Sequence, residues 1–152
     1  MPDKQSLSKF LANKGLDAML VSSVNNISYL TSYSGFSSLE RDAYLLFTPD
    51  NRYLFTNPLY SHEVAQRNSG MQVIEHTNKN PFPKNLATIL SKEKLENIGF
   101  ENDNITVLEY LKITSATPAH FIATSLDHLR TSKTPDEINK IKKACEIGDK
   151  AL

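Results

Sequence analysis

The residues of this chain that could take part in chemistry are few, and the first pair is Glu40 and Arg41. They lie near the end of a polar segment that runs from Thr31 to Asp42. Loops of this length between short elements are often functional. The apolar run that follows would hold both residues in place. Two interpretations stay open: an exposed ion pair that contributes little energy, or a charged pair that reaches toward a ligand or a partner.

Patterns for metal binding and for nucleophilic catalysis are incomplete. His62-Glu63 begins like H-E-x-x-H, in which two histidines one helical turn apart bind zinc, but the second position is Gln66. The single cysteine, Cys145, excludes an intrachain disulfide and is predicted to be a packing residue. The five glycines form neither a G-x-G-x-x-G pattern nor a phosphate-binding loop. We therefore predict no catalytic and no metal-binding residue.

The elements that would position Glu40 and Arg41 alternate between strand and helix patterns. Apolar runs predict strands over residues 17–22, 43–48, 52–56, 71–75, 97–101 and 119–124. Helical spacing and capping residues predict helices before Gly15 and over residues 24–31, 58–66, 83–95 and 106–113. The turn Pro49-Asp50-Asn51 indicates that the second and third strands form an antiparallel hairpin. We predict an α/β fold, a three-layer α/β/α arrangement with a mixed sheet of about six strands.

Composition excludes several classes of function. The chain has 17 basic and 17 acidic residues and a formal net charge of zero. Without a long basic block, neither nucleic acid nor a membrane is predicted as a partner. The N-terminal residues lack the apolar core of a signal peptide, and no apolar run approaches the ~20 residues of a membrane span. These features favour a cytoplasmic protein.

The C-terminal residues form the strongest local pattern. Thr134 and Glu137 have the spacing of a capping box, and Pro135 occupies the first helical position. Apolar residues then recur every three or four positions to the end of the chain, which predicts an apolar stripe that needs a partner. We therefore expect the front part of a longer protein, with an N-terminal domain over residues 1–129. Residues 130–152 would be a linker and the first helix of a second domain.

Three segments carry a resemblance to a known family through their order and spacing. They are Asn25-x-Ile27-x-Tyr29-Leu30-Thr31, Thr56-Asn57 followed by Tyr60 and Ala65, and Arg130-x-x-Lys133-x-x-x-Glu137-Ile138-x-x-Ile141-x-Lys143-Ala144. With the hairpin between the first and the second, the chain resembles the creatinase, aminopeptidase P and Xaa-Pro dipeptidase family along its whole length. One departure is Asn57-Pro58-Leu59-Tyr60, where many members have Asp-x-Arg-Tyr; Asn caps a helix as well as Asp does.

The resemblance implies a metallopeptidase whose N-terminal domain, seen here, precedes a catalytic domain of the pita-bread fold. In that family two Asp, one His and two Glu hold two divalent metal ions (Mn, Co or Zn), which activate water to cleave the bond before proline. Those ligands belong to the catalytic domain, so the resemblance implies no cofactor in this chain. Such N-terminal domains typically build a homodimer and lean a loop over the partner subunit's active-site entrance.

The loop at the corresponding position is Ser34–Asp42, so the resemblance implies that Glu40 and Arg41 lie at the entrance for a peptide substrate. On this view Arg41→Ala should change substrate preference and leave stability nearly unchanged. A second class stays open, because relatives without the metal site act as ligand- or protein-binding modules. The parent gene would discriminate: spaced Asp, Asp, His, Glu and Glu ligands after this domain indicate a peptidase.

Overall fold

Six strands form one mixed sheet in the computed structural model, which describes residues 4–67, 70–127, 129, 133 and 135–151. The strands are β1 (Ala18–Val21), β2 (Ala43–Phe47), β3 (Arg52–Thr56), β4 (Gln72–Glu75), β5 (Asn97–Phe100) and β6 (His120–Ala123). Their order across the sheet is β4-β3-β2-β1-β5-β6. The pairs β1–β2 and β2–β3 are antiparallel, and the pairs β1–β5, β5–β6 and β3–β4 are parallel. The predicted α/β fold with a mixed sheet is confirmed.

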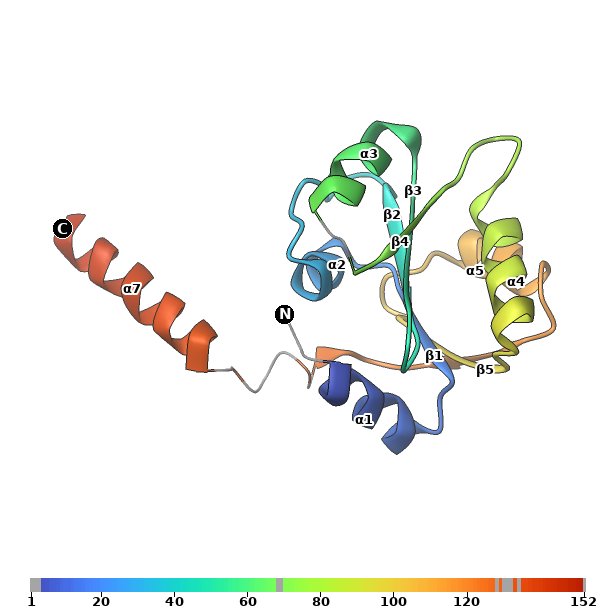
Figure 1. Ribbon diagram of the computed structural model, residues 1–152, viewed down its shortest axis with the longest axis horizontal. Helices are drawn as coiled ribbons and strands as arrows, with labels where there is room; N and C mark the ends of the chain where they lie inside the picture. Colours follow the sequence, from blue (N-terminus) through green and yellow to red (C-terminus); the bar gives the residue numbers. More distant parts are fainter. Residues whose placement is uncertain (1–3, 68–69, 128, 130–132, 134, 152) are drawn as a thin grey trace.

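Helices cover both faces of this sheet (Figure 1). One face carries α1 (Lys4–Lys14), α2 (Val24–Thr31) and α3 (Pro58–Arg67), and the other carries α4 (Phe82–Glu93) and α5 (Val107–Thr114). Successive side chains of a strand point to opposite faces. Leu45 of β2 therefore packs with α1, α2 and α3, whereas its neighbour Leu46 packs with α4 and α5. The sheet is thus buried on both sides, and the molecule has three layers.

Local sequence signals determine the ends of several elements. In the turn between β2 and β3, the N–H of Thr48 donates to the carbonyl of Asn51 at 2.9 Å, and the predicted antiparallel hairpin is confirmed. Thr106 and Glu109 form a complete capping box at the start of α5. The side chain of Asn57 accepts from the N–H two residues later at 2.9 Å, as expected of the residue that caps α3.

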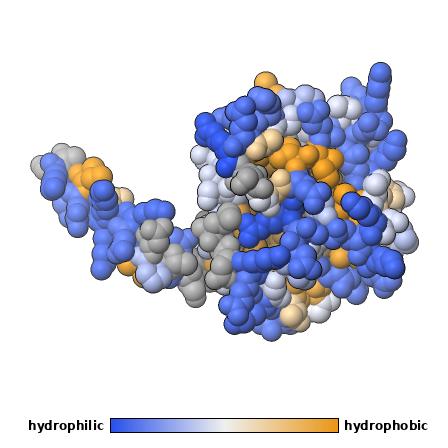
Figure 2. Space-filling view, viewed as in Figure 1, coloured by the Kyte–Doolittle hydropathy of each residue, from blue (hydrophilic) through white to orange (hydrophobic). Residues whose placement is uncertain are grey.

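The C-terminal helix α7 (Pro135–Ala151) lies away from the three layers (Figure 1). Its residues Ile138, Ile141 and Ile147 are exposed, so the apolar stripe packs against nothing in the part of the chain that the structure describes. Thr134, the first residue of the predicted capping box, lies outside that part. Figure 2 shows a mostly hydrophilic α7 and an apolar area between α3 and α4. None of the described helices combines the length and the apolar character that a membrane crossing needs.

The predicted end of α1 at Gly15 gives a test of the fold. Gly15 has a φ of +64°, in the left-handed region that side chains with a Cβ atom disfavour. Gly15→Ala should therefore lower the free energy of unfolding by about 1 kcal/mol, measured by urea denaturation. Gly70→Ala is the control, because an added Cβ meets no atom within 4 Å and the backbone is outside that region. Equal losses in both variants would contradict this account.

Candidate functional site

The loop from Ser34 to Asp42 ends beside the carboxyl ends of the parallel neighbours β1 and β5. After β1 the chain enters α2 on one face of the sheet, and after β5 it enters α5 on the opposite face. Open α/β sheets bind ligands in the crevice where adjacent strands send their connections to opposite faces. A cavity of about 330 Å³ lies at this point, and its lining includes Glu40 and Arg41 with residues of α2 and α5. The structure thus brings both predicted residues to one cavity.

Arg41 holds this cavity together through hydrogen bonds. Its Nε donates to Oε1 of Glu109 at 2.8 Å, and its terminal nitrogens donate to the side-chain and main-chain oxygens of Asn104 at 2.6 and 2.8 Å. Arg41 also donates to the main-chain carbonyl of Ser22. Its guanidinium carbon lies 5.5 Å from the centre of the Tyr44 ring, within the range of a cation–π contact. One side chain therefore joins the loop to the end of β1 and to α5.

Glu40 and Arg41 have different surroundings, and Arg41 forms its ion pair with Glu109. The side chains of Arg41 and Glu109 are only 26 and 21% exposed, so this is not the exposed pair that the sequence left open. The expectation that Arg41→Ala leaves stability nearly unchanged does not fit this geometry, because the substitution would deprive partly buried acceptors of their donor. Glu40 is exposed, and within the described residues its carboxylate makes no hydrogen bond.

The remaining N–H of Arg41 faces the second oxygen of Glu109 at 3.4 Å, so all five guanidinium N–H groups point at protein acceptors. Because every N–H group of Arg41 is engaged by protein acceptors, this side chain stabilises the structure of the site and has no donor left to bind an anion. The exposed carboxylate of Glu40 is the group of the pair that can meet a ligand. A carboxylate accepts hydrogen bonds and attracts cations such as an amino group.

Glu109 remains charged because its hydrogen bonds outweigh its burial. Burial alone would raise the pKa of this carboxyl group, but hydrogen bonds from Arg41, Thr106 and Tyr44 lower the pKa from 4.5 to about 2. The hydroxyl of Tyr44 donates to Oε1 at 2.7 Å. Burial and this hydrogen bond in turn raise the pKa of Tyr44 above its ordinary value. Glu109 is therefore ionised at neutral pH.

Sequence analysis did not single out Glu101, whose side chain is central to the site. Glu101 is 2% exposed and follows the last residue of β5. Its carboxylate accepts from the N–H groups of Ser22 and Ser23 at 2.6 and 2.8 Å, and from the side-chain amide of Asn26. Ser23 caps α2 without a side-chain hydrogen bond, so Glu101 supplies the negative charge that a helix N-terminus favours. The sequence signal, one acidic residue after an apolar strand, is also typical of exposed residues.

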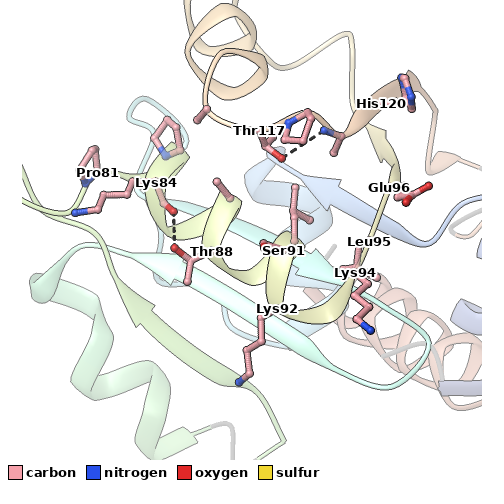
Figure 3. A pocket seen from close by; sticks show the side chains of 16 residues that line it. Pro81, Lys84, Thr88, Ser91, Lys92, Lys94, Leu95, Glu96, Thr117 and His120 are labelled. Carbon is pink, nitrogen blue, oxygen red and sulfur yellow. Dashed lines mark hydrogen bonds between the residues drawn. The ribbon is translucent and has the colours of Figure 1, made fainter.

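A larger groove of about 1320 Å³ lies between α4 and the segment that leads into β6 (Figure 3). Two of its hydroxyl groups bond within their own segments, Thr88 to the carbonyl of Lys84 at 3.0 Å and Thr117 to the N–H of Ala119 at 3.4 Å. In Figure 3 the side chain of Lys92 points away from the segment that carries Thr117. The polar groups of the groove do not converge on one point, so the smaller cavity at Arg41 is the better candidate.

The resemblance implies the two-metal site in the catalytic domain, and the described residues of this chain offer no ligand set for a pair of metal ions. No group of three or more His, Cys, Asp or Glu side chains among them could hold a metal ion. In the incomplete zinc pattern, Nε2 of His62 contacts Nε2 of Gln66 at 2.9 Å. Glu63 pairs with Arg67 and accepts from Tyr33, whose pKa is raised to about 12 by burial and by this hydrogen bond. We therefore derive no chemical step through a metal ion in this chain.

Comparison with known proteins identifies the family. Residues 4–131 match the model of the Creatinase/Prolidase N-terminal domain. The chain belongs to this family. As a creatinase/prolidase N-terminal domain, it spans about 40% of the length of the curated relatives that it matches.

This creatinase/prolidase N-terminal domain is similar both to longer Xaa-Pro dipeptidases and to an N-terminal domain that was solved by itself. The Xaa-Pro dipeptidase of Pyrococcus furiosus is 28% identical over 156 residues, covering 97% of this chain and 40% of its own length. The solved Xaa-Pro dipeptidase from Bacillus anthracis has the same fold, with a TM-score of 0.82, 23% identity, and coverage of 97% of this chain and 40% of that one. The solved N-terminal domain of cytoplasmic peptidase PepQ from Mycobacterium tuberculosis has a TM-score of 0.67 and 24% identity, covering 80% and 92%.

Glu109 gives a pH-dependent test of the site. The pKa of Glu109 is about 2 in the folded chain, below the ordinary value of 4.5. Between these two pH values the carboxyl group binds more protons in the unfolded chain than in the folded chain. The stability that Glu109 contributes is complete above the ordinary pKa and is lost as the pH falls through the folded pKa. Glu109→Gln should lower the free energy of unfolding by about 1–3 kcal/mol at neutral pH. The difference from the parent should shrink in acid.

Urea denaturation at a series of pH values measures both the loss and its pH dependence. Glu40→Gln is the matched control, because this carboxylate lines the same cavity and is exposed; we expect a change below about 0.5 kcal/mol. A loss in Glu109→Gln that does not vary with pH would contradict the pKa assignment.

Proposed function

We propose that this chain is the non-catalytic N-terminal domain of a metal-dependent Xaa-Pro peptidase, either a dipeptidase or an aminopeptidase. The family match over residues 4–131 is the observation that carries the proposal. It is supported by relatives that are Xaa-Pro dipeptidases more than twice as long as the matched part. In this proposal residues 1–129 form the domain, and residues 130–152 link it to a catalytic domain and begin that domain. The name of the Mycobacterium tuberculosis relative supports a cytoplasmic location.

We further propose that the domain helps to form a homodimer and that its Ser34–Asp42 loop borders the substrate entrance of the partner subunit. Arg41 supports this role as the residue that fixes the loop, because its donors are bound to the scaffold. Glu40 is then the residue that faces substrate. A peptide substrate with a free N-terminus carries an amino group, and an exposed carboxylate attracts that charge.

A second candidate function is a ligand- or protein-binding module from a family relative that lacks the metal site. The groove of about 1320 Å³ favours this alternative, because it is large enough for a ligand and lies away from Glu40 and Arg41. The parent gene separates the two functions. Spaced Asp, Asp, His, Glu and Glu ligands after this domain support the peptidase, and their absence supports the binding module.

The proposal predicts that the 152-residue chain hydrolyses no Xaa-Pro peptide and retains no stoichiometric Mn, Co or Zn. The reason is that the metal ligands would belong to the catalytic domain. Metal analysis of the purified chain and a peptidase assay with each metal added measure this directly. Turnover together with one or two bound metal ions per chain would overturn the assignment of this domain as non-catalytic.

In the longer protein, Glu40→Gln should alter the preference for substrate length or side chain without changing stability. The loss of one charge-assisted hydrogen bond corresponds to a fall in kcat/KM of up to about tenfold. Arg41→Ala should change the same preference and also destabilise the domain. Glu96→Gln is the control, because Glu96 is an exposed carboxylate at the opposite ends of the strands. Unchanged kinetics for Glu40→Gln across several Xaa-Pro peptides, with the dimer intact, would contradict the entrance role.

A further inference from the structure

Two leucines that follow β6 pack against helix α2. Leu126 is 3% exposed and belongs to the core on the face of the sheet that carries α1, α2 and α3, and Leu129 is partly buried against the same core. Both leucines line one narrow gap together with three residues of α2, which are Asn26, Tyr29 and Leu30. The chain therefore remains part of the three-layer domain well beyond the end of β6.

Local hydrogen bonds give this segment a defined shape. The hydroxyl of Ser125 accepts from the N–H of Asp127 at 3.0 Å and donates to the carboxylate of Asp127 at 2.8 Å, as in a turn that a serine side chain begins. The N–H of Leu129 donates to the carbonyl of Leu126 at 3.0 Å. These bonds act within a few residues, so they shape the segment but do not hold it to the rest of the domain.

The side chain of Tyr29 makes a polar contact between this segment and α2. Its hydroxyl donates to the carbonyl of Leu129 at 3.2 Å, across 100 residues of sequence. A partly buried main-chain carbonyl needs a donor, and the phenol provides one. The ring of Tyr29 packs against the same core as Leu129, so packing places the hydroxyl in position. Tyr29 therefore ties the exit of the domain to α2.

The first turn of α2 lies at the candidate site. Val24 and Asn25 line the cavity together with Glu40, and the buried carboxylate of Glu101 holds the main chain just before this turn. Tyr29 follows Asn25 by four residues, about 6 Å along the helix and on the same face. One helix of eight residues thus joins the cavity to the exit of the domain.

We propose that Tyr29 is a positioning residue for the Ser34–Asp42 loop. Its bond to Leu129 makes the loop, α2 and the exit of the domain one unit, and so fixes where the following domain begins relative to the loop. The inference rests on the proposed function, in which a catalytic domain follows and the loop borders the substrate entrance of the partner subunit. Tyr29 does not line the cavity, so its effect on catalysis passes through α2.

Amide hydrogen exchange of the 152-residue chain, measured by NMR, tests the bond itself. Tyr29→Phe keeps the ring and removes only the hydroxyl, so it should speed the exchange of the Leu129 amide about two- to tenfold. Tyr110→Phe is the matched control and should leave that rate unchanged. Tyr110 is a partly buried tyrosine on α5 whose hydroxyl bonds to none of the described residues. Circular dichroism establishes that both variants are folded. An unchanged Leu129 rate in Tyr29→Phe would overturn the proposal.

Kinetics of the longer protein test the positioning role. Tyr29→Phe should shift the preference for substrate length by about threefold, in the same direction as Glu40→Gln. The double variant should show no larger shift than Glu40→Gln alone, because a carboxylate that is absent cannot be positioned. A shift with Glu40→Gln but none with Tyr29→Phe would overturn this inference and leave the proposed entrance role standing. No shift with either variant would overturn both.

Discussion

The main chain of Ser22 and Ser23 forms hydrogen bonds with both an acidic and a basic side chain. The buried carboxylate of Glu101 accepts both N–H groups, while the guanidinium of Arg41 donates to the carbonyl of Ser22. A buried main-chain group without a partner costs roughly 1–3 kcal/mol, so neither charged residue is dispensable. Glu101 directly follows β5, and Arg41 lies in the loop before β2. Their bonds to the end of β1 therefore fix the relative positions of these three segments. The geometry of the cavity depends on this arrangement.

Local chemistry explains why the elements could be predicted from the sequence. The turn at Pro49-Asp50-Asn51, the capping box of Thr106 and Glu109, and the left-handed Gly15 each act within about four residues of the chain. Apolar runs that alternate with helical stripes then leave few arrangements, since both faces of the sheet must be covered. The family resemblance located the Ser34–Asp42 loop, which the structure places at the carboxyl ends of β1 and β5.

The partners of the charged residues could not be predicted in the same way. Arg41 and Glu109 are 68 residues apart, and Ser22 and Glu101 are 79 apart, so no spacing rule connects them. Adjacent charges in a loop indicated a pair between Glu40 and Arg41, but the fold brings a better acceptor from another element. Glu101 looked like any acidic residue after a strand. Only the sheet order, with β5 next to β1, shows that it must be buried.

The sheet order also affects how the chain can fold as it leaves the ribosome. The antiparallel ladders β1–β2 and β2–β3 join neighbours in sequence, so they can form early. The parallel ladder β1–β5 cannot form until about 80 further residues have been synthesised. At a synthesis rate of ~5–20 residues per second this takes about 4–16 s. During that interval β1 has an open edge, and α2 lacks the carboxylate that caps it. An open edge pairs readily with other extended chains, so the nascent protein is most open to such pairing during this interval.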